Sequence, residues 1–246
     1  MRVKIRQSVI KRVAPDVHRL APQLNSSFIH QTVHRAIHGV GPLPPAAAAA
    51  EKQREEQDGD VEKAIGELIE NHASMAAAQG FVANLGGITT AVATIPLNIT
   101  GLALLQVRMV AAIAHLRGYD LASPRVRNAI LLTILGPDTI KTLVKEKKIP
   151  GTPMVIATAP AYDPDLDRIV AAEVTSAIVG RVIGKRAAGT VLRRVPLAGG
   201  LWGGSADAYA TWMVGRYAAR ELRPRPAVVG TVVSSEPDQL RPRSTR

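Results

Sequence analysis

The stretch from Asn71 to Val107 contains no Asp, Glu, Lys or Arg and is rich in Ala, Gly, Thr and Leu. Soluble monomers rarely expose a contiguous apolar patch larger than roughly a few hundred Å². The stretch is therefore expected to lie in a helical core or in a bilayer. This choice constrains the fold more than any other feature of the chain.

A bilayer-spanning helix needs about 20 predominantly apolar residues. Residues 85–105 have this length, but Gly, Thr, Asn98 and Pro96 interrupt them. Three readings remain open, in this order of preference: a buried core hairpin, a shallow or re-entrant membrane hairpin that bends at Pro96, and a two-pass membrane protein.

The formal net charge of +11 favours a polyanionic partner. Aromatic residues make up only 3% of the chain, too few for a base-stacking platform, so an anionic membrane surface or a membrane protein is favoured over nucleic acid. There is no cysteine, and no pattern predicts a metal or a cofactor. Charges at Lys11 and Arg12 interrupt the N-terminal segment before a signal peptide can form, which predicts a cytoplasmic protein.

Helical periodicity predicts an all-α protein. An amphipathic helix is expected over residues 24–40, with apolar residues on one face, and it should end at Gly41. Residues 41–60 are rich in Pro, Ala and charged side chains and are expected to be a flexible linker. Asp60 is expected to cap the next helix.

Further along the chain, helix boundaries are marked by Ser, Asp, Pro and Gly. Ser123-Pro124 begins a helix that Gly136-Pro137 ends, and Asp138 begins a short helix. Asp163-Pro164 opens a long helix toward Arg194. Only residues 228–233 have a composition that suits a strand.

Two segments share the same pattern, in which a proline precedes an expected helix whose first residues have small side chains. Small residues let two helix backbones approach closely, so these two apolar helices are expected to pack on each other. The residues with this packing role are Pro96 and Gly101 in the first segment, and Pro196, Gly199, Gly200, Gly203 and Gly204 in the second.

Three stretches resemble the EcsC protein family, a bacterial family, by their order and spacing. The first is Ala76-Ala77-Ala78-Gln79-Gly80 followed by Asn84-Leu85-Gly86-Gly87. The second runs from Ile95-Pro96 through Val107-Arg108 and Ile113-Ala114 to Gly118-Tyr119-Asp120. The third is Val195-Pro196-Leu197-Ala198-Gly199-Gly200. The resemblance implies a helical, membrane-associated domain, and it carries over no catalytic residue.

The resemblance covers residues 60–222, which are expected to form a single helical domain. Residues 1–59 then form a basic arm, an amphipathic helix and a low-complexity linker. Residues 223–246 are a Pro- and Arg-rich tail that is expected to be disordered. No pattern predicts an oligomeric state.

A basic cluster precedes the Gly-rich helix, in a region without acids between Glu173 and Asp207. Its cations are candidates for contact with anionic lipid, together with both tryptophans, although a solvated helix face is the simpler reading. These candidates are Arg181, Lys185, Arg186, Arg193, Arg194, Trp202 and Trp212.

Two other function classes stay open. A small hydrolase or lipid-modifying enzyme would place its site between the apolar helices and would use Asp120, Asp207 or His72. An adaptor would use the basic N-terminal arm. The row of His30, His34 and His38 is read as a solvated face, because a single helix cannot bring all three to one metal ion.

Overall fold

The computed structural model describes residues 26–41, 43–85, 87–192 and 196–224, without the side chains of residues 26, 80–100, 179 and 181–204. The described chain is all-helical and contains no strand. The helices are α2 (Ser26–His38), α3 (Ala46–Glu56), α4 (Val61–Leu85), α5 (Gly87–Leu116), α6 (Pro124–Thr133), α7 (Pro137–Lys145), α8 (Pro153–Ala157), α9 (Pro164–Leu192) and α10 (Pro196–Glu221). The predicted strand at residues 228–233 lies outside the described residues.

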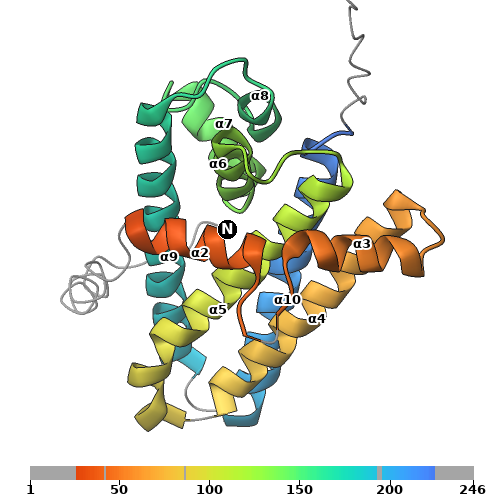
Figure 1. The fold of residues 1–246 in the computed structure, drawn as a ribbon. Helices are drawn as coiled ribbons and strands as arrows, with labels where there is room; N and C mark the ends of the chain where they lie inside the picture. Colours follow the sequence, from red (N-terminus) through yellow and green to blue (C-terminus); the bar gives the residue numbers. More distant parts are fainter. Residues whose placement is uncertain (1–25, 42, 86, 193–195, 225–246) are drawn as a thin grey trace, which may run out of the picture.

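Helix α5 is the centre of the fold. All residues from Met109 to Ala114 are buried, as expected for a helix with neighbours on every side. Helices α2, α3, α4 and α10 pack on it, and α10 also packs along α4 (Figure 1). Helices α6, α7 and α8 cover one end of the bundle (Figure 1).

Several predicted helix ends are confirmed. Asp60 caps α4, because its Oδ1 accepts hydrogen bonds from the backbone N–H of Glu62 (3.0 Å) and Lys63 (3.1 Å). Helix α9 begins at Pro164 and runs to Leu192. Gly136 separates α6 from α7 with φ +84°, a conformation that favours glycine.

The predicted linker over residues 41–60 is wrong, because residues 46–56 form α3. Five consecutive alanines have the highest intrinsic helix propensity, and Ala46 and Ala50 are buried in the packing with α4 and α5. Helix α2 ends at Gly39 (φ +87°) rather than at Gly41. Its predicted apolar face is buried in the main core, so α2 and α3 belong to the same helical body as residues 61–222.

The prediction that Pro96 begins a helix is also wrong. Helix α5 begins at Gly87 and continues through Pro96, so the chain turns between Leu85 and Gly87. A proline inside a helix removes one backbone hydrogen bond and clashes with the preceding turn, which disfavours the helix by about 3 kcal/mol or more. Pro196, by contrast, is the first residue of α10 as predicted.

Helices α5 and α10 do pack on each other, although α10 packs more extensively on α4. The close approach of α10 occurs at Gly215, which lies against Ile69 of α4 and Met109 of α5. Gly101 instead lies against Gln79 of α4. The surroundings of Gly199, Gly200, Gly203 and Gly204 are not among those described, so their packing role stays a prediction.

Candidate functional site

Four long helices bring their ends to the same end of the molecule (Figure 1). We call it the tip end, and it consists of the last turns of α4 and α9 and the first turns of α5 and α10. The uncharged stretch from Asn71 to Val107 forms the part of α4 and α5 that leads into the tip end. The uncharged stretch therefore leads to one pole of the protein.

The tip end is also free of acidic residues. Residues 71–107 and 174–206 contain no Asp or Glu. Arg181, Lys185 and Arg186 lie in the half of α9 that approaches the tip end, while Arg193 and Arg194 lie outside the described residues. The composition of the two hairpins at this pole is thus apolar and cationic.

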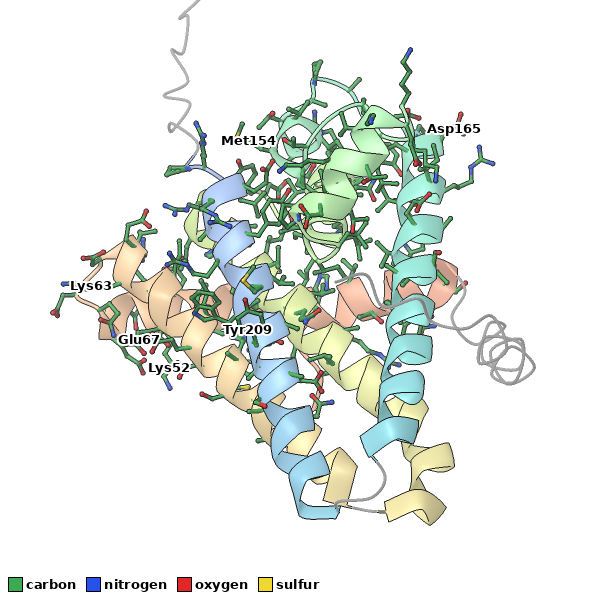
Figure 2. All side chains as sticks on the ribbon, turned by 180° about the vertical axis from the view of Figure 1, so that it is seen from behind. Lys52, Lys63, Glu67, Met154, Asp165 and Tyr209 are labelled. Carbon is green, nitrogen blue, oxygen red and sulfur yellow. The ribbon has the colours of Figure 1, made fainter. Side chains whose placement is uncertain are left out.

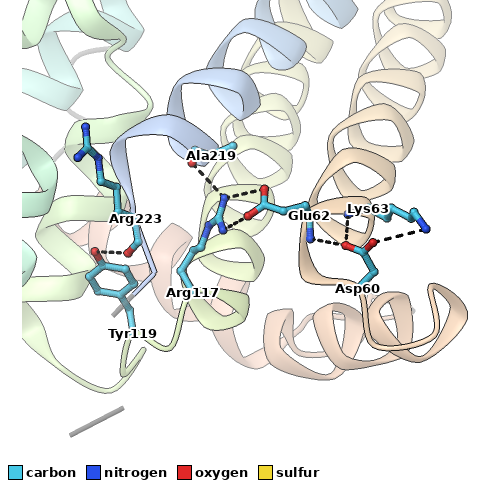
Figure 3. Close-up of polar contacts among 7 residues, drawn as sticks. All are labelled: Asp60, Glu62, Lys63, Arg117, Tyr119, Ala219 and Arg223. Carbon is cyan, nitrogen blue, oxygen red and sulfur yellow. Dashed lines mark hydrogen bonds and ion pairs between the residues drawn. The ribbon is translucent and has the colours of Figure 1, made fainter. Parts of the chain in front are cut away.

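Acidic residues lie away from the tip end. They include Asp165 at the start of α9 and Glu62 at the start of α4, and Figure 2 shows Asp165 and Lys63 far from the tip end. Glu62 binds the buried guanidinium of Arg117, with 3.0 Å between its Oε2 and Nη2 of the arginine (Figure 3). The same Nη2 donates to the carbonyl oxygen of Ala219 (3.3 Å), which ties α10 to α5.

Helix α10 carries an exposed aromatic stripe. Tyr209 is 65% exposed, and its ring stacks on that of Trp212 with 6.3 Å between the centroids. The guanidinium of Arg216 lies 5.6 Å from the Trp212 ring centroid. Figure 2 shows Tyr209 on the side of α10 that faces α4. Trp and Tyr with a neighbouring Arg are typical of residues at a membrane–water interface.

An open cavity of about 610 Å³ lies between the end of α2, the start of α3 and the residues that follow α5. Its polar lining residues are His38, His115 and Asp120. Nε2 of His115 lies 2.7 Å from a carboxylate oxygen of Glu51 in α3. A carboxylate and a histidine therefore meet at a largely apolar cavity.

The other acid–base candidates are elsewhere. His72 and Asp207 are buried and do not line this cavity. Nδ1 of His72 lies 2.8 Å from the Leu68 carbonyl oxygen. Burial, together with the nearby charge of Arg108, lowers the pKa of His72 to about 4.

Among the described residues, no group of histidines and carboxylates could hold a metal ion. His30, His34 and His38 are exposed along α2, and the last two stack on each other. Nε2 of His30 lies 3.4 Å from a carboxylate oxygen of Asp167. The basic residues before α2 on which an adaptor would depend lie outside the described chain.

The sequence model of the EcsC protein family matches residues 2–226. The chain belongs to this family. Its match begins well before residue 60, in agreement with the packing of α2 and α3 on the same core. Comparison with curated proteins and with solved structures gave no significant match.

Within this EcsC chain, none of the helices formed by described residues is long and apolar enough to cross a bilayer. Sequence reasoning located the basic cluster and Trp212, but it missed His115 and Glu51. These two residues are 64 positions apart in the chain. Only the packing of α3 on α5 brings them together, and that packing was hidden while residues 41–60 were read as a linker.

Proposed function

We propose that the protein binds anionic membrane surfaces peripherally, with the tip end toward the lipid. The observation that carries this proposal is the meeting of two hairpin ends, one without charged residues and one with cations but no acids (Figure 1). Apolar side chains partition into the interface, while cations attract anionic headgroups. The described acids lie away from the tip end, which favours one orientation over the other.

The expected electrostatic contribution is large. Each Lys or Arg near an anionic leaflet adds about 1 kcal/mol, so five cations would add about 5 kcal/mol. This corresponds to a gain of between about a thousand- and ten-thousand-fold in the vesicle partition coefficient. Because salt screens exposed charges beyond about 8 Å at physiological ionic strength, binding should weaken steeply as salt is raised.

The test is co-sedimentation with vesicles of increasing anionic lipid content. In one variant, all five cations of the basic cluster are changed to Gln, and binding should fall to that seen with neutral vesicles. The matched control changes five exposed lysines away from the tip end to Gln: Lys52, Lys63, Lys141, Lys145 and Lys147. Both variants lose the same net charge, so an equal loss of binding in both would reject a docking role for the tip end.

The two tryptophans report the orientation directly. Trp202 lies six residues into α10, about 9 Å from its start, and Trp212 lies sixteen residues in, about 24 Å. In single-tryptophan variants, Trp212→Phe and Trp202→Phe, brominated lipids should quench Trp202 more strongly than Trp212. Equal quenching would indicate docking along the side of α10, through its aromatic stripe, and would contradict the tip-first geometry.

A hydrolytic function is a second candidate, favoured by the cavity that Asp120 and His115 line, where His115 also contacts Glu51. A histidine oriented by a carboxylate can take a proton from water that attacks an ester. Hydrolysis of p-nitrophenyl esters by the parent, lost in His115→Gln and Asp120→Asn, would support this candidate. Turnover that is absent in the parent or unchanged in both variants would contradict it.

A further inference from the structure

Arg108 is a buried cation without an acidic partner in the described part of the chain. Its side chain is 5% exposed, and Nη1 donates a hydrogen bond to the carbonyl oxygen of Pro44. Burial lowers the pKa of Arg108, and no described acid is close enough to raise it. Arginine is rarely buried unless it is paired, because the charge loses its hydration.

Arg117, the residue that follows α5, shows how a buried arginine is usually accommodated. It is buried to a similar extent, but Glu62 binds its guanidinium through two hydrogen bonds (Figure 3). The buried arginine within α5 and the one that follows this helix thus differ in that Arg108 lacks an anionic partner among the described residues.

His72 lies in the same layer of the bundle as Arg108. Ala50 of α3, Leu68 of α4 and Ala112 of α5 form one buried cluster. Ala46, His72 and Arg108 each lie one helical turn from one of these residues. Burial and, after it, the nearby charge of Arg108 lower the pKa of His72, so these two side chains are close to each other. Nε2 of His72 is buried and has no hydrogen-bond partner in the described structure. His72 thus has an unsatisfied polar atom close to Arg108.

The N-terminus of α3 adds a positive partial charge near Arg108. Pro45 precedes the helix and provides no side-chain cap, so the first N–H groups of α3 lack the usual acceptor. Arg108 binds the residue before Pro45, which places the guanidinium at the positive end of the helix dipole. Pro45 and Ala47 also line the open cavity, so solvent reaches this first turn.

We infer that Arg108, His72 and the N-terminal turn of α3 form a binding site for an oxyanion, the phosphate group of a small phosphorylated molecule. A phosphate would pair the guanidinium, accept hydrogen bonds from the first N–H groups of α3, and accept one from Nε2 of His72 in the tautomer that carries the proton there. Arg108 and His72 do not line the cavity beside Pro45 and Ala47, so the phosphate would reach them past the first turn of α3, and the cavity would hold the remainder of the molecule.

The site is separate from the tip end. Arg108 lies 21 residues from the start of α5, about 32 Å along the helix. A leaflet bound at the tip end does not present its headgroups at this distance, so the ligand comes from the aqueous phase. The inference does not depend on membrane binding.

The experiment measures thermal unfolding of the full chain in a zwitterionic buffer, with inorganic phosphate against chloride at equal ionic strength. Phosphate should raise the parent's midpoint by about 5 to 10 °C at a concentration 100-fold above the dissociation constant. Arg108→Met should be at least as stable as the parent without phosphate, because it removes an unpaired buried charge, and should gain nothing from phosphate. An equal gain in Arg108→Met would overturn the assignment.

Arg117→Met is the matched control, since it removes an equally buried arginine that has a partner. It should melt well below the parent and keep the phosphate gain. Calorimetric titration of the native parent tests the site without any variant, and sulfate should compete with phosphate. The absence of phosphate binding overturns the inference, as does an effect of short-chain phosphatidic acid that free phosphate cannot reproduce.

Discussion

Gly215 is the point at which α10 comes closest to its two neighbours. A Cβ placed on this residue would lie 2.7 Å from Cγ1 of Ile69 and 3.1 Å from Sδ of Met109. Met109 is flexible and can shift, but a β-branched isoleucine has few alternative rotamers. A methyl group at Gly215 should therefore push α10 away from α4.

The magnitude follows from a comparison of two glycines. Overpacking costs about 1 to 3 kcal/mol, while replacing a helical Gly by Ala gains about 1 kcal/mol of helix propensity. A Cβ placed on Gly66 of α4 would meet open space, so Gly66→Ala receives the gain alone. Because the propensity gain is the same in both variants, Gly215→Ala should be less stable than Gly66→Ala by the overpacking cost, about 1 to 3 kcal/mol.

Urea unfolding followed by circular dichroism measures this difference, and thermal midpoints should differ by about 2 to 12 °C. In a double-mutant cycle, Ile69→Ala should relieve part of the cost of Gly215→Ala, because both γ carbons that the new methyl meets are removed. If Gly215→Ala were as stable as Gly66→Ala, α10 would not pack as closely as the structure has it.

Two more predictions concern the core. Removing residues 1–59 deletes α2 and α3 and exposes the apolar surface of α5, so the fragment 60–222 should unfold or aggregate in sedimentation and dichroism measurements. For His72, the pKa is about 4 in the folded chain against 6.5 ordinarily. The unfolded chain therefore takes up the proton first, and about 3 kcal/mol of stability, present above pH 6.5, should be lost as the pH falls toward 4. In phosphate-free buffer, His72→Leu should remove this part of the pH dependence.

Local signals explain why most helix ends could be predicted from the sequence. Asp60 and Gly136 act through their own backbone neighbourhood, as an acceptor for nearby N–H groups and as a residue that tolerates positive φ. These effects depend on two or three adjacent residues, so they are visible before the fold is known.

Tertiary packing explains the errors. The segment with α3 looked too polar to fold alone, and only burial of Ala46 and Ala50 against other helices stabilises it. Pro96 was expected to start a helix, because proline suits that position, but the chain turns nearer Leu85. Propensity describes what an isolated segment prefers, and packing of the whole bundle outweighs it.

The candidate sites divide in the same way. The cations and tryptophans could be listed from the sequence, since they depend on composition, whereas the position of Arg181, Lys185 and Arg186 in the half of α9 that approaches the tip end required the directions of four helices. Two arginines, one within α5 and one directly after it, show this limit. Arg108 and Arg117 look alike in the sequence, and the partner of Arg117 is Glu62, 55 residues away. A neighbouring helix decides whether a buried charge is neutralised. A buried arginine without an anionic partner can therefore be recognised only once the packing of the helices is known, and the same holds for the ligand site that we propose there.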